Sequence, residues 1–331
     1  MKTNMASYRS GTALLAAAVC GLLIANQVFG EAFIVKDGQP QADIVIADQP
    51  PRMVKLAALE LQEYIEKISG ARLPIATAPG KDLPAHIYIG KSKFTDQLKV
   101  SGDGLKYGAF RMVAGKDWLA LLGHDRDFTP PEYTSRDPKD LQRWDERTGD
   151  KWVNPMTDWQ STYSSAAGVF DFDERGSLNA VYEFLRSLGI RWYMTGDLGE
   201  ILPGKMQTIA LPQVDKEVHP DFPYRDLGSY SPAFYFGSRD AILYRLRIGL
   251  DPSPTIMGRD WPHGLNNVHS RAETKQAHPE YYALYDGKRS VGTDKSAGFP
   301  CLSSEGLFHS TVKYARTVFD IYPDKPTIGI M

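Results

Sequence analysis

Cysteine is almost absent from this sequence. Only Cys20 and Cys301 occur among 331 residues, and Cys20 lies in an apolar N-terminal run. If that run is removed, one cysteine remains, so an intrachain disulfide is excluded and burial of a core must hold the fold together. Cys301 lies between Pro300 and Leu302, an apolar setting, and is expected to be a buried structural residue rather than a nucleophile.

The sequence also lacks an excess of charge of either sign. Its 38 Lys and Arg side chains are offset by 40 Asp and Glu, and no basic stripe is present, so nucleic acid is not an expected partner. A glycine-rich phosphate loop and a Gly-x-Ser-x-Gly motif are both missing. His263, His269 and His278 are spaced by six and nine residues, which matches no metal-ligand pattern. No metal or other cofactor is therefore expected.

The N-terminus has the features of an export signal. Lys2 and Arg9 precede an apolar run over 12–25, and Val28 and Gly30 have the spacing that an export peptidase accepts. The run is shorter than the roughly 20 residues that a membrane span needs. We expect a secreted or periplasmic protein that starts at residue 31 and has no membrane span after cleavage. A retained N-terminal anchor is the alternative.

The rest of the chain has the composition of a folded protein. It is 42% hydrophobic and 24% charged, and its length favours two domains. The 6 Trp and 17 Tyr residues either fill the core or stack on sugar rings, so they point only mildly toward a carbohydrate ligand.

Short β-like runs alternate with helical ones between residues 31 and 215. Apolar residues at spacings of three and four predict a helix over 53–68, closed by Gly70, and another over 177–188, closed by Gly189. Strands are expected at 33–35, 44–47, 86–89, 107–113, 118–122 and 190–193. Strands that alternate with one-faced helices predict an α/β or α+β sandwich.

The stretch from Gly123 to Gly168 shows neither a helical nor a strand period. It carries Trp144, Trp152 and Trp159 among many charges and prolines. Disordered segments are poor in aromatic residues, so we expect an ordered, aromatic-rich insertion. Two interpretations stay open: a loop packed on its own domain, or a lid over a neighbouring site.

A second region is expected to follow a charged, proline-containing linker at 215–223. The patterns beyond it predict a strand at 224–229, helices at 240–248 and 305–322, and a strand at 327–331. In the last helix, the residues expected on the inward side are Leu307, Val312, Ala315 and Phe319.

Several segments resemble known families. LAALELQEYIEKISG at 56–70, and RGSLNAVYEFLRSLGIRWY at 175–193 with GEILP at 199–203, are similar to the α/β accessory domain that precedes the barrel in β-hexosaminidases and α-glucuronidases. The later segments NVH at 267–269, HPEYY at 278–282, DGKR at 286–289 and CLS at 301–303 resemble a group of secreted bacterial proteins. That group carries a long-uncharacterised barrel domain, and some members are assigned to glycoside hydrolase family 163.

The resemblance implies a hexosaminidase- and α-glucuronidase-like accessory domain at 31–215, with the insertion at 123–168, followed by a (β/α)8, or TIM-type, barrel from residue 222. Such a barrel needs about 250 residues, so 222–331 would form about three βα units of an incomplete barrel. In hexosaminidase-like barrels the catalytic acid lies on a later strand. The resemblance therefore implies a chain that is truncated at its C-terminus, with its catalytic carboxylates outside the given sequence.

Binding residues are expected in two places. Asp226 ends the first barrel-like strand beside Arg225, and this pair either holds sugar hydroxyls or forms a salt bridge at the rim. The loop after residue 260 is either a sugar-binding loop or an ordinary polar loop. Its candidate side chains are Trp261, His263, Asn267 and His269. The acidic cluster Asp171, Asp173 and Glu174 lies just ahead of a helix, where acids counter the helix dipole.

The export signal and the resemblance together predict the N-terminal portion of an exported glycoside hydrolase. Its partner would be a complex glycan or polysaccharide, and its parent reaction acid/base cleavage of a glycosidic bond. The alternative is a non-catalytic carbohydrate-binding or scaffold protein. A third interpretation is a broken gene product whose unpaired strand at 328–330 promotes aggregation.

Overall fold

The computed structural model describes residues 32–129, 138–155, 163–225, 239–251, 264–293, 296–323 and 328–330. The export signal predicted at 1–30 lies outside these residues. Within them, no helix combines the length and the apolar character that crossing a membrane requires.

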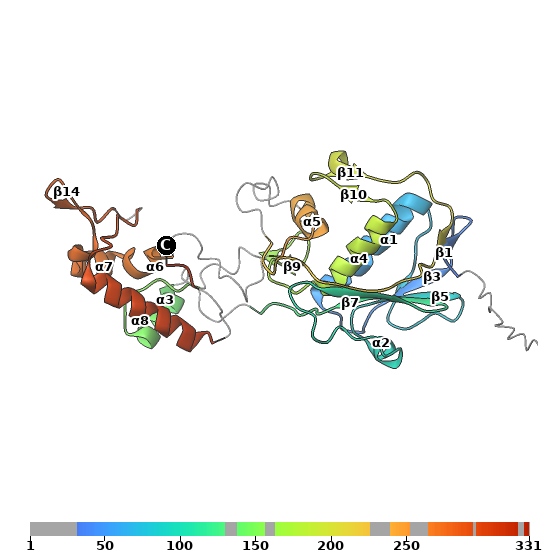
Figure 1. The fold of residues 1–331 in the computed structure, drawn as a ribbon, viewed down its shortest axis with the longest axis horizontal. Coiled ribbons are helices and arrows are strands. Elements are labelled where there is room, and N and C mark those ends of the chain that lie inside the picture. The colour runs from blue at the N-terminus through green and yellow to red at the C-terminus, as the bar shows by residue number, and fades with distance from the viewer. Residues whose placement is uncertain are drawn as a thin grey trace, which may run out of the picture. The chain divides into compact units, whose positions relative to one another are not determined.

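A six-stranded mixed sheet forms the centre of the N-terminal part of the chain (Figure 1). Its spatial order is β13 (Asp215–Val218), β6 (Phe110–Ala114), β7 (Trp118–Gly123), β5 (Ala85–Ile89), β3 (Ala42–Val45) and β4 (Ile75–Ala76). The strands from β7 to β4 run parallel, whereas β6 and β13 are antiparallel to their neighbours. Strands β3, β5 and β7 are almost continuously apolar and buried, as parallel strands covered on both faces must be.

A smaller antiparallel sheet flanks the first one. It is formed by β12 (Ile209–Ala210), β1 (Phe33–Lys36) and β2 (Gln39–Pro40). A third pairing joins β8 (Tyr163–Ser164) to β9 (Val169–Phe170).

Two long helices cover one face of the main sheet, and a short one lies on the other (Figure 1). The covering helices are α1 (Arg52–Ser69) and α4 (Gly176–Ser187), and the short helix is α2 (Lys93–Gln97). The apolar stripe of α1 faces the sheet and carries Met53, Leu61 and Ile65, each without exposed surface. Gly70 ends α1 in the left-handed conformation, with φ 81°.

Helix α5 (Arg239–Arg247) packs onto this same core. Its Leu243 and Leu246 belong to the hydrophobic cluster of α1, α4 and the sheet. Arg247 reaches the fully buried Glu60 of α1 through two hydrogen bonds, of 2.8 Å and 3.1 Å. Tyr182 of α4 donates a hydrogen bond to the same carboxylate. The Glu60 carboxylate therefore connects α1 to α5 through an ion pair and to α4 through a hydrogen bond.

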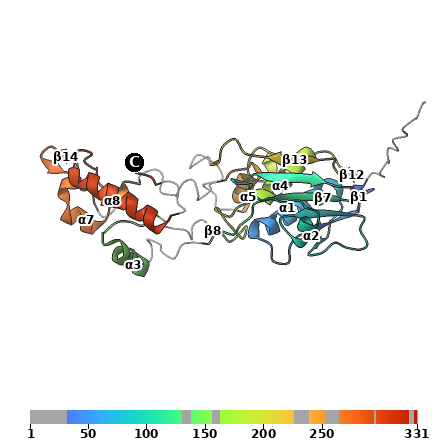
Figure 2. The ribbon, with the colours of Figure 1, turned by 60° about the horizontal axis from the view of Figure 1, so that its bottom comes forward.

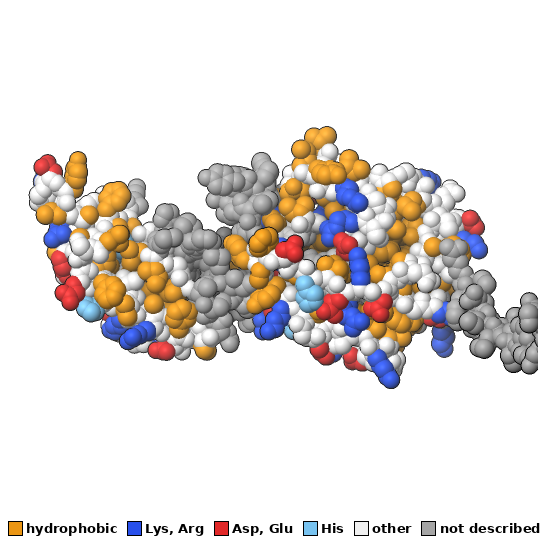
Figure 3. Space-filling model, viewed as in Figure 1, with side chains coloured by type: hydrophobic (Ala, Val, Ile, Leu, Met, Phe, Trp, Pro, Cys, Tyr) orange, Lys and Arg blue, Asp and Glu red, His pale blue; other side chains and the backbone are white. Residues whose placement is uncertain are grey.

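A hairpin of β10 (Arg191–Trp192) and β11 (Glu200–Ile201), with the 3-10 turn η2 (Asp197–Gly199) between them, extends from α4. Trp192 points inward, and its indole nitrogen donates to the Tyr64 hydroxyl at 2.7 Å. The opposite side of the hairpin is apolar and exposed, as Figure 3 shows. The exposed side chains are Tyr193, Met194, Leu198, Ile201 and Leu202.

A second hydrophobic core joins residues that are far apart in the sequence. It is formed by α3 (Pro138–Thr148), α6 (Asn266–His269), η4 (Pro279–Tyr281) and α8 (Glu305–Ile321) with the residues beside them, and the same part of the chain contains α7 (Ala272–Ala277) and the hairpin of β14 (Leu284–Tyr285) and β15 (Lys288–Arg289). Its buried members are Trp144, Trp152, Val268, Tyr281, Tyr282, Leu307, Tyr314 and Val318. Figure 2 shows α8 beside α7 and α3. Trp144, fully buried, comes from the stretch between β7 and α4.

Four predictions about secondary structure are wrong. The stretch 123–168 is not aperiodic, because it contains α3, a mostly charged helix. Residues Asp215–Val218 are not linker but the edge strand β13, whose charged, alternating sequence hides its pairing with β6. Residues 328–330 form no strand. Helix α8 buries Leu307, Tyr314 and Val318, whereas Phe319 is exposed.

The structure shows a mixed α/β protein. Among the described residues after Phe222, the strand pairs are the β14–β15 hairpin and isolated bridges, all antiparallel, so no closed or parallel barrel is seen there. Cys301 is partly exposed rather than buried. The Ser303 hydroxyl lies 3.4 Å from its sulfur and lowers the pKa of the thiol.

Candidate functional site

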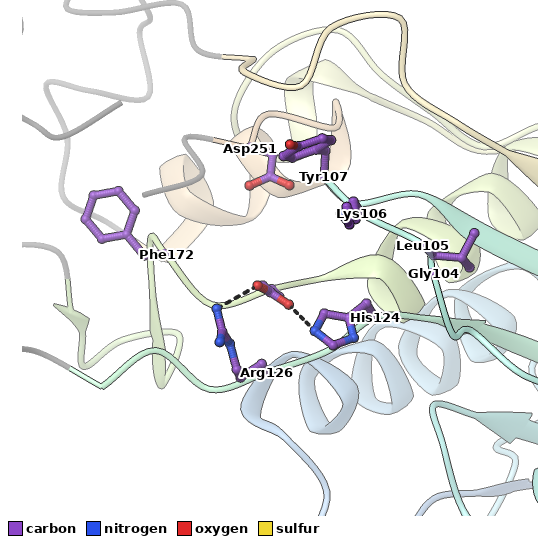
Figure 4. A pocket seen from close by; sticks show the side chains of 10 residues that line it. Gly104, Leu105, Lys106, Tyr107, His124, Arg126, Phe172 and Asp251 are labelled. Carbon is purple, nitrogen blue, oxygen red and sulfur yellow. Dashed lines mark hydrogen bonds and ion pairs between the residues drawn. The ribbon is translucent and has the colours of Figure 1, made fainter. Parts of the chain in front are cut away.

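A pocket of about 380 Å³ lies at the C-terminal edge of the main sheet (Figure 4). His124 and Arg126 directly follow β7, and Phe172 and Glu174 directly precede α4. Asp251 from beyond α5 and the loop Gly104–Gly108 complete the wall. Open α/β sheets bind their ligands at the carboxyl ends of parallel strands, so this pocket occupies the expected edge.

Glu174 is held by the side chains of His124 and Arg126. Its carboxylate lies 2.7 Å from His124 Nε2 and accepts a hydrogen bond of 3.0 Å from Arg126, and the dashed lines in Figure 4 mark these contacts. The Glu174 amide also donates to the Arg126 carbonyl. The Glu174 side chain is 28% exposed at the pocket, and its Oε2 atom, which faces His124, is buried.

Arg225, a predicted binding residue, contacts the main chain and the Asp251 side chain of the pocket wall. Its guanidinium donates to the carbonyls of Gly249, Phe222 and Tyr107, at 2.8, 2.8 and 3.1 Å. It also pairs with the buried Asp251 at 3.5 Å, and the two main chains form an antiparallel bridge. Burial lowers the pKa of Arg225, an effect that Asp251 opposes. The observed partner of Arg225 is Asp251, whereas the predicted partner, Asp226, lies outside the described residues, so the two predicted alternatives for the Arg225–Asp226 pair stay open.

The loop that carries Tyr107 has an unusual backbone. Tyr107 and Gly108 are both left-handed, with φ of 59° and 77°, and tyrosine rarely adopts that conformation. A Cβ at Gly108 would lie 2.6 Å from Asn179 Nδ2 and 2.9 Å from Asp251 Oδ2. Asn179 donates to the Gly108 carbonyl at 2.8 Å, and Arg225 to that of Tyr107. These two contacts hold the conformation and leave the Tyr107 ring 40% exposed at the pocket.

Asp125 lies between the two pocket residues His124 and Arg126 but points into the protein. Its carboxylate accepts hydrogen bonds from the Ser177 amide and hydroxyl, and so caps the N-terminal turn of α4. Burial raises the pKa of Asp125 to about 7, against the lowering effect of both hydrogen bonds. The carboxylate anchors the pocket strand end to α4.

The acidic cluster ahead of α4 has two separate roles. Asp173 is buried and accepts hydrogen bonds from Arg52 and from the amides of Phe128 and Phe170. It therefore stabilises the local structure, whereas Glu174 lines the pocket.

Asn267 and His269 belong to the second core rather than to the pocket. Both lie on α6, and His269 is fully buried, with its ring 5.5 Å from that of Tyr282 in an edge-to-face contact. Burial lowers the pKa of His269, an effect that the Ala297 main chain opposes. Asp226, Trp261 and His263 lie outside the described residues.

In the part of the chain that the structure describes, no cluster of three or more His, Cys, Asp or Glu side chains is placed to hold a metal ion.

Sequence reasoning missed most of the pocket. Lys106, Tyr107, His124 and Arg126 were not predicted, and Glu174 was assigned to the helix dipole. A signal was present, because a charged triplet directly follows the apolar strand β7. Since parallel strands end at one edge, such a triplet marks a candidate site.

Comparisons with known proteins identify no family. The chain matches no protein-family model and no curated protein. Among solved structures, it is similar to a glycoside hydrolase family 115 4-O-methyl-α-glucuronidase with specificity for decorated arabinogalactans, at 13% identity and a TM-score of 0.41. The match covers 88% of this chain and 40% of the other. The resemblance to glycoside hydrolase family 163 stays a prediction.

Proposed function

We propose that this chain is part of an exported glycoside-hydrolase-type protein and that the pocket of its α/β part binds a saccharide. The observation that carries the proposal is the pocket itself. It places an exposed aromatic ring, Tyr107, near a fixed acceptor, Glu174, and cationic donors on Lys106 and Arg126. Apolar faces with a few placed polar groups are typical of small-molecule sites, and sugars offer matching ring faces and hydroxyls.

The pocket is a binding site in this proposal and not the catalytic centre. Hydrolysis usually needs two carboxyl groups, one acting as an acid and one as a base or nucleophile. Glu174 lies between His124 and Arg126, and Asp251 pairs with Arg175 and Arg225, an arrangement suited to holding a ligand. The catalytic carboxylates, and the barrel that the resemblance implies after residue 222, are proposed to lie largely outside the described residues.

The test is binding of a glycan library to the exported chain, measured by calorimetry for each hit. Glu174→Gln should weaken saccharide binding about tenfold or more, because charge-assisted hydrogen bonds are among the strong ones. The matched control is Glu66→Gln, which removes the surface ion pair between Glu66 of α1 and Arg72. The absence of binding by any saccharide to the intact, folded chain would remove the proposal.

Catalysis separates the main proposal from its alternative, a non-catalytic binding or scaffold protein. Release of sugar from a bound glycan by the protein as it occurs in the cell supports a hydrolase. Binding with no product under the same conditions supports the alternative. The export part is tested by N-terminal sequencing of the mature protein, which should begin at Glu31.

A further inference from the structure

The charged side chains that line the pocket are not all paired with one another. Two carboxylates, those of Glu174 and Asp251, are met by four cationic side chains in the described residues. Two of the cations line the pocket and two pair with Asp251 behind its wall. They are Lys106, Arg126, Arg175 and Arg225. The lining itself carries two cations and two carboxylates, but Glu174 pairs with Arg126, and Asp251 pairs with Arg175 and Arg225 behind the wall, so neither carboxylate is left to pair with Lys106.

Lys106 is the cation of this group without a counter-ion. Arg126 is paired with Glu174, and Arg225 with Asp251. Across the described ranges, by contrast, no ion pair or hydrogen bond of the Lys106 ammonium occurs, although the side chain is exposed and lines the pocket. A charge that other parts of the wall leave uncompensated is available to a ligand.

The backbone of the loop that carries Lys106 and Tyr107 is held by hydrogen bonds. The Ala109 amide donates to the Lys106 carbonyl at 3.0 Å and closes the turn, and Arg225 and Asn179 hold the next two carbonyls. A left-handed tyrosine costs conformational energy, and such strain is often retained where a side chain is presented to a ligand. Figure 4 shows both side chains, labelled, at the pocket.

We propose that the pocket selects a saccharide that carries an acid group, a carboxylate or a sulfate. Lys106 pairs with the acid, and the Tyr107 ring lies against the face of the sugar. Arg225 is a positioning residue, because it acts on the ligand only through the backbone of the loop. This inference rests on the saccharide-binding function proposed above.

The experiment measures the dissociation constants of the exported chain for three trisaccharides. The first is built of galacturonic acid, the second of galactose, which is neutral, and the third is a sulfated form of the second. Lys106→Gln should weaken binding of the preferred acid about tenfold, and should leave the neutral sugar unchanged. Lys81→Gln, at an exposed lysine outside the pocket wall, is the control. Tyr107→Gly suits the left-handed backbone, and should weaken acidic and neutral sugars by the same factor.

The outcomes separate the two proposals. A preference for either acidic sugar that is lost in Lys106→Gln supports the inference. Comparison of the galacturonic acid and sulfated trisaccharides shows which acid group the pocket prefers. Equal binding of acidic and neutral sugars by the intact chain overturns it while saccharide binding stands. Unchanged binding in Lys106→Gln overturns it as well. If none of the glycans binds, both proposals fail.

Discussion

At the scale of single residues, Arg225 and Arg247 make their contacts within the protein. Arg225 donates its hydrogen bonds to main-chain carbonyls. Arg247 is paired with the carboxylate of Glu60, which has no exposed surface. The guanidinium of Arg247 also lies 5.1 Å from the centre of the Tyr64 ring. An arginine–aspartate pair in the sequence therefore indicated a structural clamp as readily as a ligand contact.

Loss of the Glu60 carboxylate should strongly destabilise the α/β part. Glu60→Ala leaves Arg247 buried without its partner, which costs about 3–5 kcal/mol in comparable cases. The measurement is the free energy of unfolding in urea. The double variant Glu60→Leu with Arg247→Met removes both charges and should recover much of the loss. Equal destabilisation in the single and double variants would contradict this account.

Asp125 should make stability depend on pH in an unusual direction. Its pKa is about 7 in the folded chain, against an ordinary value of 3.8. Between these values the folded state binds a proton that the unfolded state has lost, so this contribution is greatest below about pH 4 and falls as pH rises to about 7. Asp125→Asn should remove that fall.

The measurement is the urea midpoint across this range for both chains. Asp103→Asn, whose side chain is 82% exposed, is the control. The same slope in the original chain and in Asp125→Asn would show that another group is responsible.

At the scale of elements, the contact between β7 and α4 positions the pocket. Gly123 ends the strand and Gly176 begins the helix, and their backbones touch because neither has a side chain. This close approach brings His124 beside Glu174. The resemblance segment at 175–193 contains that glycine, yet its importance is visible only when the strand end is placed against it.

Gly176→Ala should push these two elements apart. The new Cβ would lie 2.7 Å from Gly123 Cα and from the His124 amide, which are backbone atoms with little freedom to move. We expect a loss of about 1–3 kcal/mol in unfolding free energy together with weaker saccharide binding. Gly204→Ala, where nothing lies within 4 Å, is the matched control. Unaltered stability in Gly176→Ala would contradict the described packing.

Elements with a strong apolar stripe were predictable from sequence, and polar ones were not. Helices α1, α4, α5 and α8 were placed within a residue or two, because each repeats apolar residues at helical spacing. Helix α3 and strand β13 are largely charged, and tertiary contacts decide their structure. The pocket escaped prediction for a related reason, since its wall joins four separate segments that meet only after folding.

At the scale of the whole molecule, two hydrophobic cores divide the chain in an order that differs from the sequence. The first takes residues from β1 to β12 and then Leu243 and Leu246 of α5. The second combines Trp144 and Trp152 with residues 268–318. Trp144 and Trp152 of the aromatic-rich stretch after β7 are therefore part of a hydrophobic core.

Trp144→Ala should unfold the second core selectively. Removing a fully buried tryptophan costs about 3–5 kcal/mol. Hydrogen exchange should then speed up in α8 and remain slow in β5 and β7. Phe308→Ala, at a side chain 62% exposed on α8, should change little. Equal loss of protection in both cores would show that they unfold as one cooperative unit.

The split second core has a consequence for synthesis of the protein. Trp144 leaves the ribosome about 120 residues before Val268, the first fully buried member of the second core in the later segment. At a translation rate of about 5–20 residues per second, its indole waits roughly 6–25 s without a place to bury. During that interval the nascent chain exposes the apolar Trp144 side chain, to which chaperones can bind. A translational pause between the two segments would lengthen this exposure and change the yield of folded protein.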